Sequence, residues 1–203
     1  IQPSWIQWAD KAPDELHTVA SVLAIDPAAS EKQTADPTAK LVVKLGLDGN
    51  VYVCAISNKK QSPTKSAKET HDMYTVFEPN AVAIEEGILN LVFKDLLAGL
   101  PVIGVKPDKD KVRRLLAVAR FFEAGRVYIV KGIKNAQALY DQLIEFPSGS
   151  HDDMVDALVY AIRLLLVDGM VSDDDIEVAG NYPTGDDDDG EDDDDDDESD
   201  NDW

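Results

Sequence analysis

The apolar run Val19–Ile25 is the feature that most restricts the fold, because it stops abruptly at Asp26-Pro27. A continuous apolar stretch of this length is typical of a central strand that is buried on both faces. Two more strand-like runs follow, Leu41–Leu47 and Val51–Ser57, and the sequence Asp48-Gly49-Asn50 between them is a strong hairpin signal. We therefore expect the first third of the chain to form a sheet.

Helices and short strands alternate after this hairpin. The pattern predicts helices over Pro63 to about Tyr74, Gly87–Leu97, Asp108–Glu123, Ala136–Ile144 and Asp152–Val167, and strands over Ala81–Ile84, Val102–Val105 and Val127–Val130. Open sheets with such alternation bind ligands beyond the carboxyl ends of their strands. We predict an α/β fold, with a mixed central sheet of about five or more strands flanked by helices.

The chain divides into three parts by composition. Residues 1–18, with Pro3, Pro13 and two tryptophans, indicate an irregular lead-in or linker from a preceding domain, and residues 19–170 carry the predicted strands and helices. Residues 171–203 are strongly acidic, with 18 acids and no Lys or Arg, so we expect this tail to be disordered. The other 22 acids and 19 bases give residues 1–171 a net charge of only −3, which is compatible with nucleic-acid binding on a basic face.

Membrane and secreted classes are not expected. The single cysteine, Cys54, cannot form an intramolecular disulfide and favours a reducing compartment. Residues Ile1–Asp10 do not resemble a signal peptide, and the late apolar stretch Met154–Val167 is too short and too charged to span a bilayer. We predict a soluble protein without a membrane partner.

Three groups of acids are the candidate chemistry. Asp26 and Glu85 each end a predicted strand, and the third group, Asp152, Asp153 and Asp156, opens the last helix. An acid at the end of a buried strand is costly unless it has a partner such as a metal. Carboxylate oxygens suit Mg²⁺ or Mn²⁺, whereas three scattered histidines and one cysteine give no zinc-ligand spacing.

Each acid also has a structural interpretation. Asp152 and Asp153 suit the first turn of a helix, and Asp26-Pro27 suits a turn. Glu86 is the rival of Glu85, because a shift of one residue turns a strand side chain to the other face. His151 is either a proton-transfer group or structural, and Asp36 either supports the site or is a surface acid. The three groups together, at two strand ends and a helix start, favour a shared site.

The densest basic cluster follows the predicted strand Val102–Val105. It contains Lys106, Lys109, Lys111, Arg113 and Arg114. We predict that these residues contact DNA phosphates with little base specificity, the alternative being a solvated helix face.

The chain resembles the nuclease domains of tailed-bacteriophage large terminases over roughly residues 20–167. Asp26-Pro27-Ala28-Ala29-Ser30 is similar to their first motif, Ile84-Glu85 to the second, and the basic stretch to the helix between the second and third. The third motif is matched nearly letter for letter by Phe146-Pro147, His151-Asp152-Asp153 and Asp156-Ala157-Leu158.

This resemblance implies a ribonuclease H-like fold and a metal-dependent endonuclease that cuts concatemeric viral double-stranded DNA during packaging. It implies two divalent ions, Mg²⁺ or Mn²⁺. We predict that Asp26 bridges the two ions, with Glu85 on one side and Asp152 or Asp153 on the other. Asp152 and Asp153 are both expected to be ligands, with Asp156 near enough to assist. The implied partners are a packaging ATPase domain, a small terminase subunit and a portal, in the host cell cytoplasm.

Two features depart from the family pattern. The chain has no Gly-x-x-x-x-Gly-Lys-Ser/Thr phosphate loop, so we expect the nuclease half without ATP-driven translocation. The acidic tail either mimics DNA, binds a basic partner, restrains the nuclease or solubilises the protein. The alternative functions are a Holliday-junction resolvase or transposase, a sugar-kinase or chaperone-like ATPase, and a non-catalytic acidic interaction protein.

Overall fold

A mixed seven-stranded sheet forms the centre of the protein. The computed structural model describes residues 1–27, 37–106, 110–168 and 170. The strands are β1 (Ile6–Ala9), β2 (Thr18–Asp26), β3 (Thr38–Gly46), β4 (Val51–Lys59), β5 (Ala81–Glu85), β6 (Val102–Val105) and β7 (Val127–Val130). Their order across the sheet is β1-β7-β4-β3-β2-β5-β6. The predicted α/β fold with a mixed central sheet is confirmed.

Strand direction brings most carboxyl ends to one edge of the sheet. β3 is antiparallel to both β2 and β4, whereas the other neighbours pair in parallel. Every described strand except β3 therefore ends at the same edge, which we call the carboxyl edge. Asp26 closes β2 there, and Glu85 closes the adjacent strand β5. The two strand-end acids thus lie on neighbouring strands.

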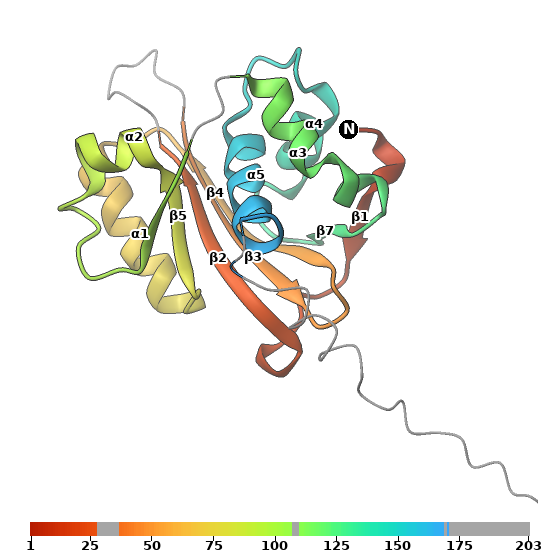
Figure 1. Cartoon of the computed structure of the whole chain (residues 1–203), viewed down its shortest axis with the longest axis horizontal. Helices are drawn as coiled ribbons and strands as arrows, with labels where there is room; N and C mark the ends of the chain where they lie inside the picture. The colour runs from red at the N-terminus through yellow and green to blue at the C-terminus, as the bar shows by residue number, and fades with distance from the viewer. Residues whose placement is uncertain (28–36, 107–109, 169, 171–203) are drawn as a thin grey trace, which may run out of the picture.

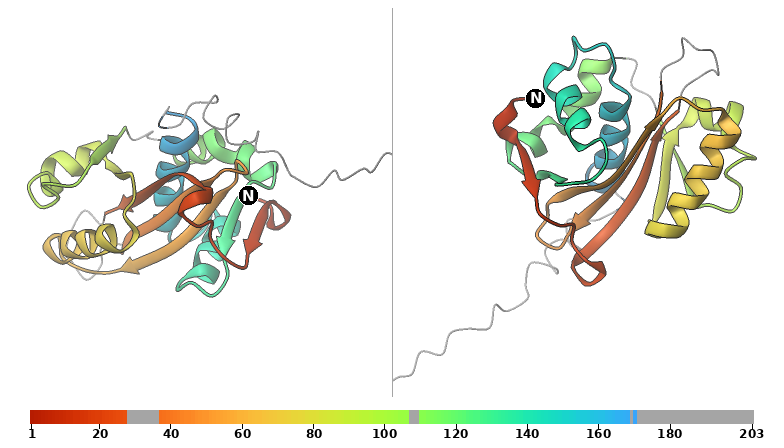
Figure 2. Two further views of the ribbon diagram at one scale, coloured as in Figure 1. Left: turned by 90° about the horizontal axis from the view of Figure 1, so that it is seen from below. Right: turned by 180° about the vertical axis from the view of Figure 1, so that it is seen from behind.

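Helices cover both faces of the sheet (Figures 1 and 2). One face carries α1 (Pro63–Phe77), the short α2 (Glu86–Ile88) and the π-helical η3 (Leu89–Phe93), and the other carries α3 (Lys111–Glu123), α4 (Ala136–Glu145) and α5 (Asp153–Leu166). Short 3₁₀ turns, η1 (Pro3–Trp5) and η2 (Glu15–His17), flank β1. None of the helices in the described ranges has the length and apolar character needed to cross a membrane.

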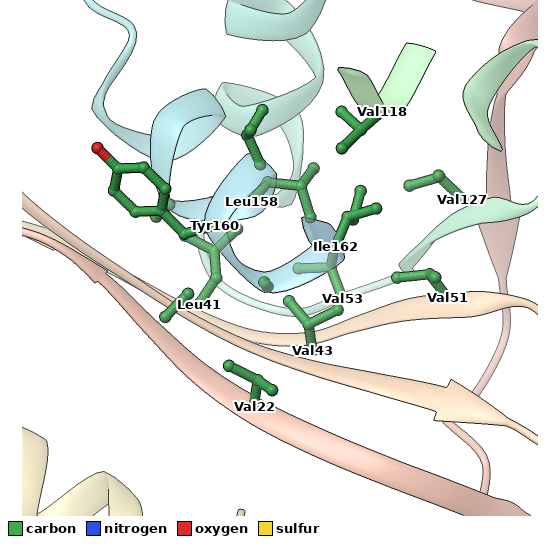
Figure 3. Packing of buried hydrophobic residues seen from close by; sticks show 14 of the residues in the cluster. Val22, Leu41, Val43, Val51, Val53, Val118, Val127, Leu158, Tyr160 and Ile162 are labelled. Atoms are coloured by element: carbon green, nitrogen blue, oxygen red, sulfur yellow. The ribbon is translucent and has the colours of Figure 1, made fainter. Parts of the chain in front are cut away.

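Helix α5 packs across the middle of the sheet and anchors the larger apolar core (Figure 3). Its Leu158 and Ile162 are almost completely buried, as are Val22 and Val43 on the strands beneath. Burial of each such side chain contributes about 1.5–3 kcal/mol. This packing fixes the first turn of α5 near the carboxyl edge, where the third group of acids lies.

The predicted irregular lead-in is wrong for part of residues 1–18. Ile6–Ala9 forms β1, which pairs in parallel with β7, and Ile6 is only 5% exposed. Trp8 packs against the ring of Tyr140, with 5.7 Å between the ring centroids. A four-residue strand that pairs with residues more than a hundred positions away leaves almost no local pattern. That residues 1–18 connect to a preceding domain stays a prediction.

Several predicted boundaries shift in the structure. Helix α3 begins at Lys111, because the Asp110 side chain accepts hydrogen bonds from the N–H groups of Val112 and Arg113. The predicted helix Gly87–Leu97 changes to π-helix and ends at Phe93. Asp36, Lys109 and the acidic tail lie outside the described residues.

Candidate active site

Asp26 lies at the carboxyl end of β2, on the face covered by α5. Alternation along the strand places it on the same side as Ala24, which belongs to the core beneath α5. Burial raises the pKa of Asp26 well above its usual value, and the nearby charges of Asp156, Asp153 and Glu85 raise it further. Arg114 opposes this shift. The environment of Asp26 is therefore crowded with negative charge.

The first turn of α5 supplies two buried aspartates. Asp153 and Asp156 are three residues apart on one helical face, and each is only 6% exposed. Asp152 occupies the N-cap position and is half-buried. The helix start is held by Gln142, whose Oε1 accepts a hydrogen bond from the Met154 N–H at 3.1 Å. The charges of Asp153 and Asp156 both act on Asp26, so this helix start lies near the end of β2.

Arg114 connects α3 to these carboxylates. Its Nη2 donates to Asp156 Oδ2 at 3.0 Å, and its Nη1 donates to Tyr160 Oη at 3.4 Å. The side chains of Arg114 and Asp156 are each 9% exposed. We predicted that Arg114 contacts phosphate with the rest of the basic cluster, but its guanidinium instead lies inside the protein as the counter-charge of the acidic group.

Tyr160 extends this network to β5. Its hydroxyl donates to Glu85 Oε2 at 3.4 Å, and Figure 3 shows the hydroxyl directed away from the apolar side chains of the core. Burial and the charges of Asp26 and Asp156 raise the pKa of Tyr160, so the phenol stays protonated at neutral pH. Glu86 is exposed and lies beside Gly104 of β6. Of the two adjacent glutamates, Glu85 is the one within this network.

Two of the remaining basic residues lie on the surface within the described part of the chain. Lys106 follows β6 at the carboxyl edge and is exposed, as is Arg113 on α3. Arg163 of α5 donates to the Lys106 carbonyl at 3.4 Å and pairs with Asp168 at 3.3 Å. Lys109 and the side chain of Lys111 lie outside the described residues. His151 is exposed just before α5.

The donor chemistry of this site fits a divalent cation. Asp26, Glu85, Asp153 and Asp156 bring four carboxyl groups together, and within the described ranges the buried guanidinium of Arg114 is the counter-charge that opposes them. An excess of buried negative charge is stabilised when carboxylate oxygens bind Mg²⁺ or Mn²⁺. Within the described ranges, no three His, Cys, Asp or Glu side chains already have the close spacing of a preformed metal centre.

The fold and the site define an α/β domain with an acidic centre at the carboxyl edge of its sheet. The family model described as "Terminase RNaseH-like domain" matches residues 23–165, which run from the second half of β2 through most of α5. The chain therefore belongs to the terminase ribonuclease H-like domain family. This membership separates it from the resolvase, transposase and sugar-kinase alternatives.

Solved structures with the same fold include several terminases. A large terminase from a thermophilic bacteriophage, solved with ADP, aligns with 82% of this chain and 44% of its own at 15% identity and a TM-score of 0.62. The chain thus spans less than half of that protein. The nuclease of the phage G20c large terminase with bound magnesium aligns over 78% of this chain and 93% of its own, at 14% identity and a TM-score of 0.60.

A solved structure from a human virus has the same fold as well. The human cytomegalovirus terminase nuclease domain, soaked with manganese and bound to an inhibitor, aligns over 78% of this chain and 88% of its own, at 12% identity and a TM-score of 0.56. A comparison with curated proteins gives no significant match.

Sequence reasoning missed the internal roles of two residues. Tyr160 lies four positions after Asp156, so helical spacing alone places it on the same face. Arg114 lies four positions before the buried Val118 and on the buried side of α3. Each spacing of four residues indicates, from the sequence alone, that the polar side chain lies on the buried side of its helix.

Proposed function

We propose that this chain is the nuclease part of a phage large terminase, which cuts concatemeric double-stranded DNA during genome packaging. The reaction is hydrolysis of a phosphodiester bond with little base specificity, leaving a 5′ phosphate and a 3′ hydroxyl. The single observation that carries the proposal is the convergence of Asp26, Glu85, Asp153 and Asp156 at the carboxyl edge of a terminase-family domain.

Asp26, Glu85 and Asp153 are the residues that we propose to hold two divalent ions, with Asp152 as the alternative to Asp153. Bound Mg²⁺ or Mn²⁺ supplies activation of the attacking water and stabilisation of the leaving oxygen. Structures of related terminase nucleases with magnesium, cobalt and manganese support divalent-metal use.

The other side chains of the network orient these ligands. Arg114 fixes the carboxylate of Asp156 through its 3.0 Å contact, and the Tyr160 hydroxyl fixes Glu85. Groups that orient metal ligands by hydrogen bonds commonly change metal affinity when they are removed. We therefore assign Arg114 and Tyr160 as positioning residues, and Lys106 and Arg113 as contacts to phosphate, with Lys109 and Lys111 as further candidates.

The whole-protein context follows from the same proposal. A packaging ATPase domain, a small terminase subunit and a portal are the proposed partners, in the cytoplasm of the infected host cell. The relative that was solved with ADP supports coupling to an ATPase, because this chain aligns with only 44% of it.

Plasmid cleavage tests the proposal. Wild-type protein is expected to cut plasmid DNA with Mn²⁺ or Mg²⁺ but not with EDTA, whereas Asp26→Asn is expected to be inactive. Asp95→Asn is the matched control, because Asp95 is an exposed acid on the segment between η3 and β6. Equal cutting by the wild type and Asp26→Asn would overturn the assignment of the site.

A further inference from the structure

A basic segment at the carboxyl edge has no part in the network described above. The twelve residues Ser57–Lys68 contain four lysines and no acid, although residues 1–171 as a whole are slightly negative. Lys59 ends β4, Lys60 follows it, and Lys65 lies in the first turn of α1; all three are exposed. We call these three residues the β4–α1 lysine surface.

Among the described residues, Glu69 of α1 is an acid that contacts this surface, and it is shared by two lysines. Glu69 Oε2 accepts from Lys40 Nζ at 2.7 Å, and Glu69 Oε1 pairs with Lys59 at 2.5 Å. Lys40 is completely buried, so one of the two lysines that Glu69 binds lies inside the protein. Even with Glu69 included, residues 57–69 contain four lysines and one acid, so this stretch of the chain has a positive formal charge.

The strand register places this surface beside the acidic site. Asp26 pairs with Ala39, and Ala39 pairs with Asn58, so Asn58 lies two strands away from Asp26. Neighbouring strands are about 4.8 Å apart, which puts the end of β4 roughly 10 Å from the end of β2. Lys59 is the next residue along β4.

The opposite side of the site has a matching arrangement. Glu85 pairs with Val105 at the end of β6, and the exposed Lys106 comes next. β6 is also two strands from β2 in the sheet order. Basic residues thus flank the carboxylates at similar distances on both sides along one edge.

We propose that the β4–α1 lysine surface binds the phosphate backbone of duplex DNA on the side of the cut opposite to Lys106. This inference rests on the proposed nuclease function and specifies how the duplex lies: along the carboxyl edge, from β4 to β6, with the carboxylates between. Lys59 contacts α1 and so lies on the other face of the sheet from Asp26. The major groove of B-DNA is about 12 Å wide, and the whole duplex is wider than one groove. A duplex that lies on the carboxyl edge therefore contacts residues on both faces of the sheet.

Salt-dependent DNA binding without cutting tests this surface. Affinity for a short labelled duplex is measured by fluorescence anisotropy over a salt series, with EDTA and in an Asp26→Asn background. The test variant is Lys60→Gln/Lys65→Gln, which leaves the Lys59–Glu69 pair intact. The control, Lys94→Gln/Arg120→Gln, removes the same charge from exposed positions on the segment after η3 and on the last turn of α3.

Each lost phosphate contact lowers the slope of log affinity against log salt by about 0.9. The test variant is therefore expected to lose about two units of slope and to bind more weakly, whereas the control keeps the parent slope. Equal slopes for the test and control variants would overturn the proposed DNA-binding surface. The nuclease function would still be supported in that case if the wild type cuts plasmid DNA. If the test variant has a reduced slope but the wild type never cuts DNA, the proposed DNA-binding surface is supported and the proposed nuclease function is rejected.

Discussion

Replacing Arg114 by Met is expected to destabilise the metal-free protein strongly. The guanidinium is 3.0 Å from Asp156, both side chains are 9% exposed, and Arg114 is the cation whose charge opposes the raised pKa of Asp26. Breaking a buried ion pair by removing one partner typically costs about 3–5 kcal/mol. For a domain of this size, that loss lowers Tm by roughly 6–20 °C.

Thermal and urea unfolding in EDTA at neutral pH measure this effect. Arg113→Met is the matched control, since Arg113 is the exposed neighbour on the same helix and its loss is expected to change the free energy of unfolding by less than about 0.5 kcal/mol. The difference between Arg114→Met and wild type should shrink at acidic pH, because the carboxyl groups then take up protons. A loss below about 1 kcal/mol at neutral pH would refute the role of Arg114 as internal counter-charge.

Three further predictions concern Tyr160, Glu69 and Asp26. Tyr160→Phe removes the hydroxyl that binds Glu85, so Mn²⁺ affinity measured by calorimetry should fall about 10–100-fold with the fold retained; unchanged affinity would contradict this positioning role. Burial alone would raise the pKa of Glu69, but hydrogen bonds from Lys40, Lys59, Gln61 and Ser57 lower it from 4.5 to about 2. Glu69 therefore stabilises the fold above about pH 4.5, and this contribution should disappear as the pH falls towards 2. When Tm is measured against pH, the part of the decrease that Glu69 causes in the wild type should be absent in Glu69→Gln. The folded-state pKa of Asp26 is raised, so ionisation of this carboxyl group opposes folding above about pH 4. Asp26→Asn should therefore raise Tm in EDTA at neutral pH. A lower Tm would argue against the crowding of negative charge around Asp26.

Much of the fold was predictable because its central elements have strong local patterns. The run before Asp26 has the composition of a doubly buried strand, and the hairpin turn contains Gly49 with a positive φ of 72°. β1 was not predictable from local pattern, because its four residues depend on pairing with β7, far along the chain. Tertiary contact, rather than propensity, decides such a strand.

The candidate site was predictable at the level of its acids. Parallel strands bring their ends to one edge, so Asp26 and Glu85 follow from strand order once β5 is placed beside β2. The role of Arg114 did not follow from the basic run that contains it, because charge composition does not distinguish an exposed arginine from a buried one. Sequence spacing leaves open which of Asp152, Asp153 and Asp156 binds metal, because all three lie at the start of one helix and helix ends are poorly fixed by sequence alone.

Calorimetric titration of Mn²⁺ tests most directly whether the acidic group is a metal centre. All proteins should end at Gly180, so that most of the acidic tail does not contribute binding. The wild type should bind Mn²⁺ tightly, Asp26→Asn and Asp153→Asn should lose this binding, and Asp95→Asn should keep it. Retention of tight Mn²⁺ binding by Asp26→Asn and Asp153→Asn would contradict a metal centre formed by these carboxylates.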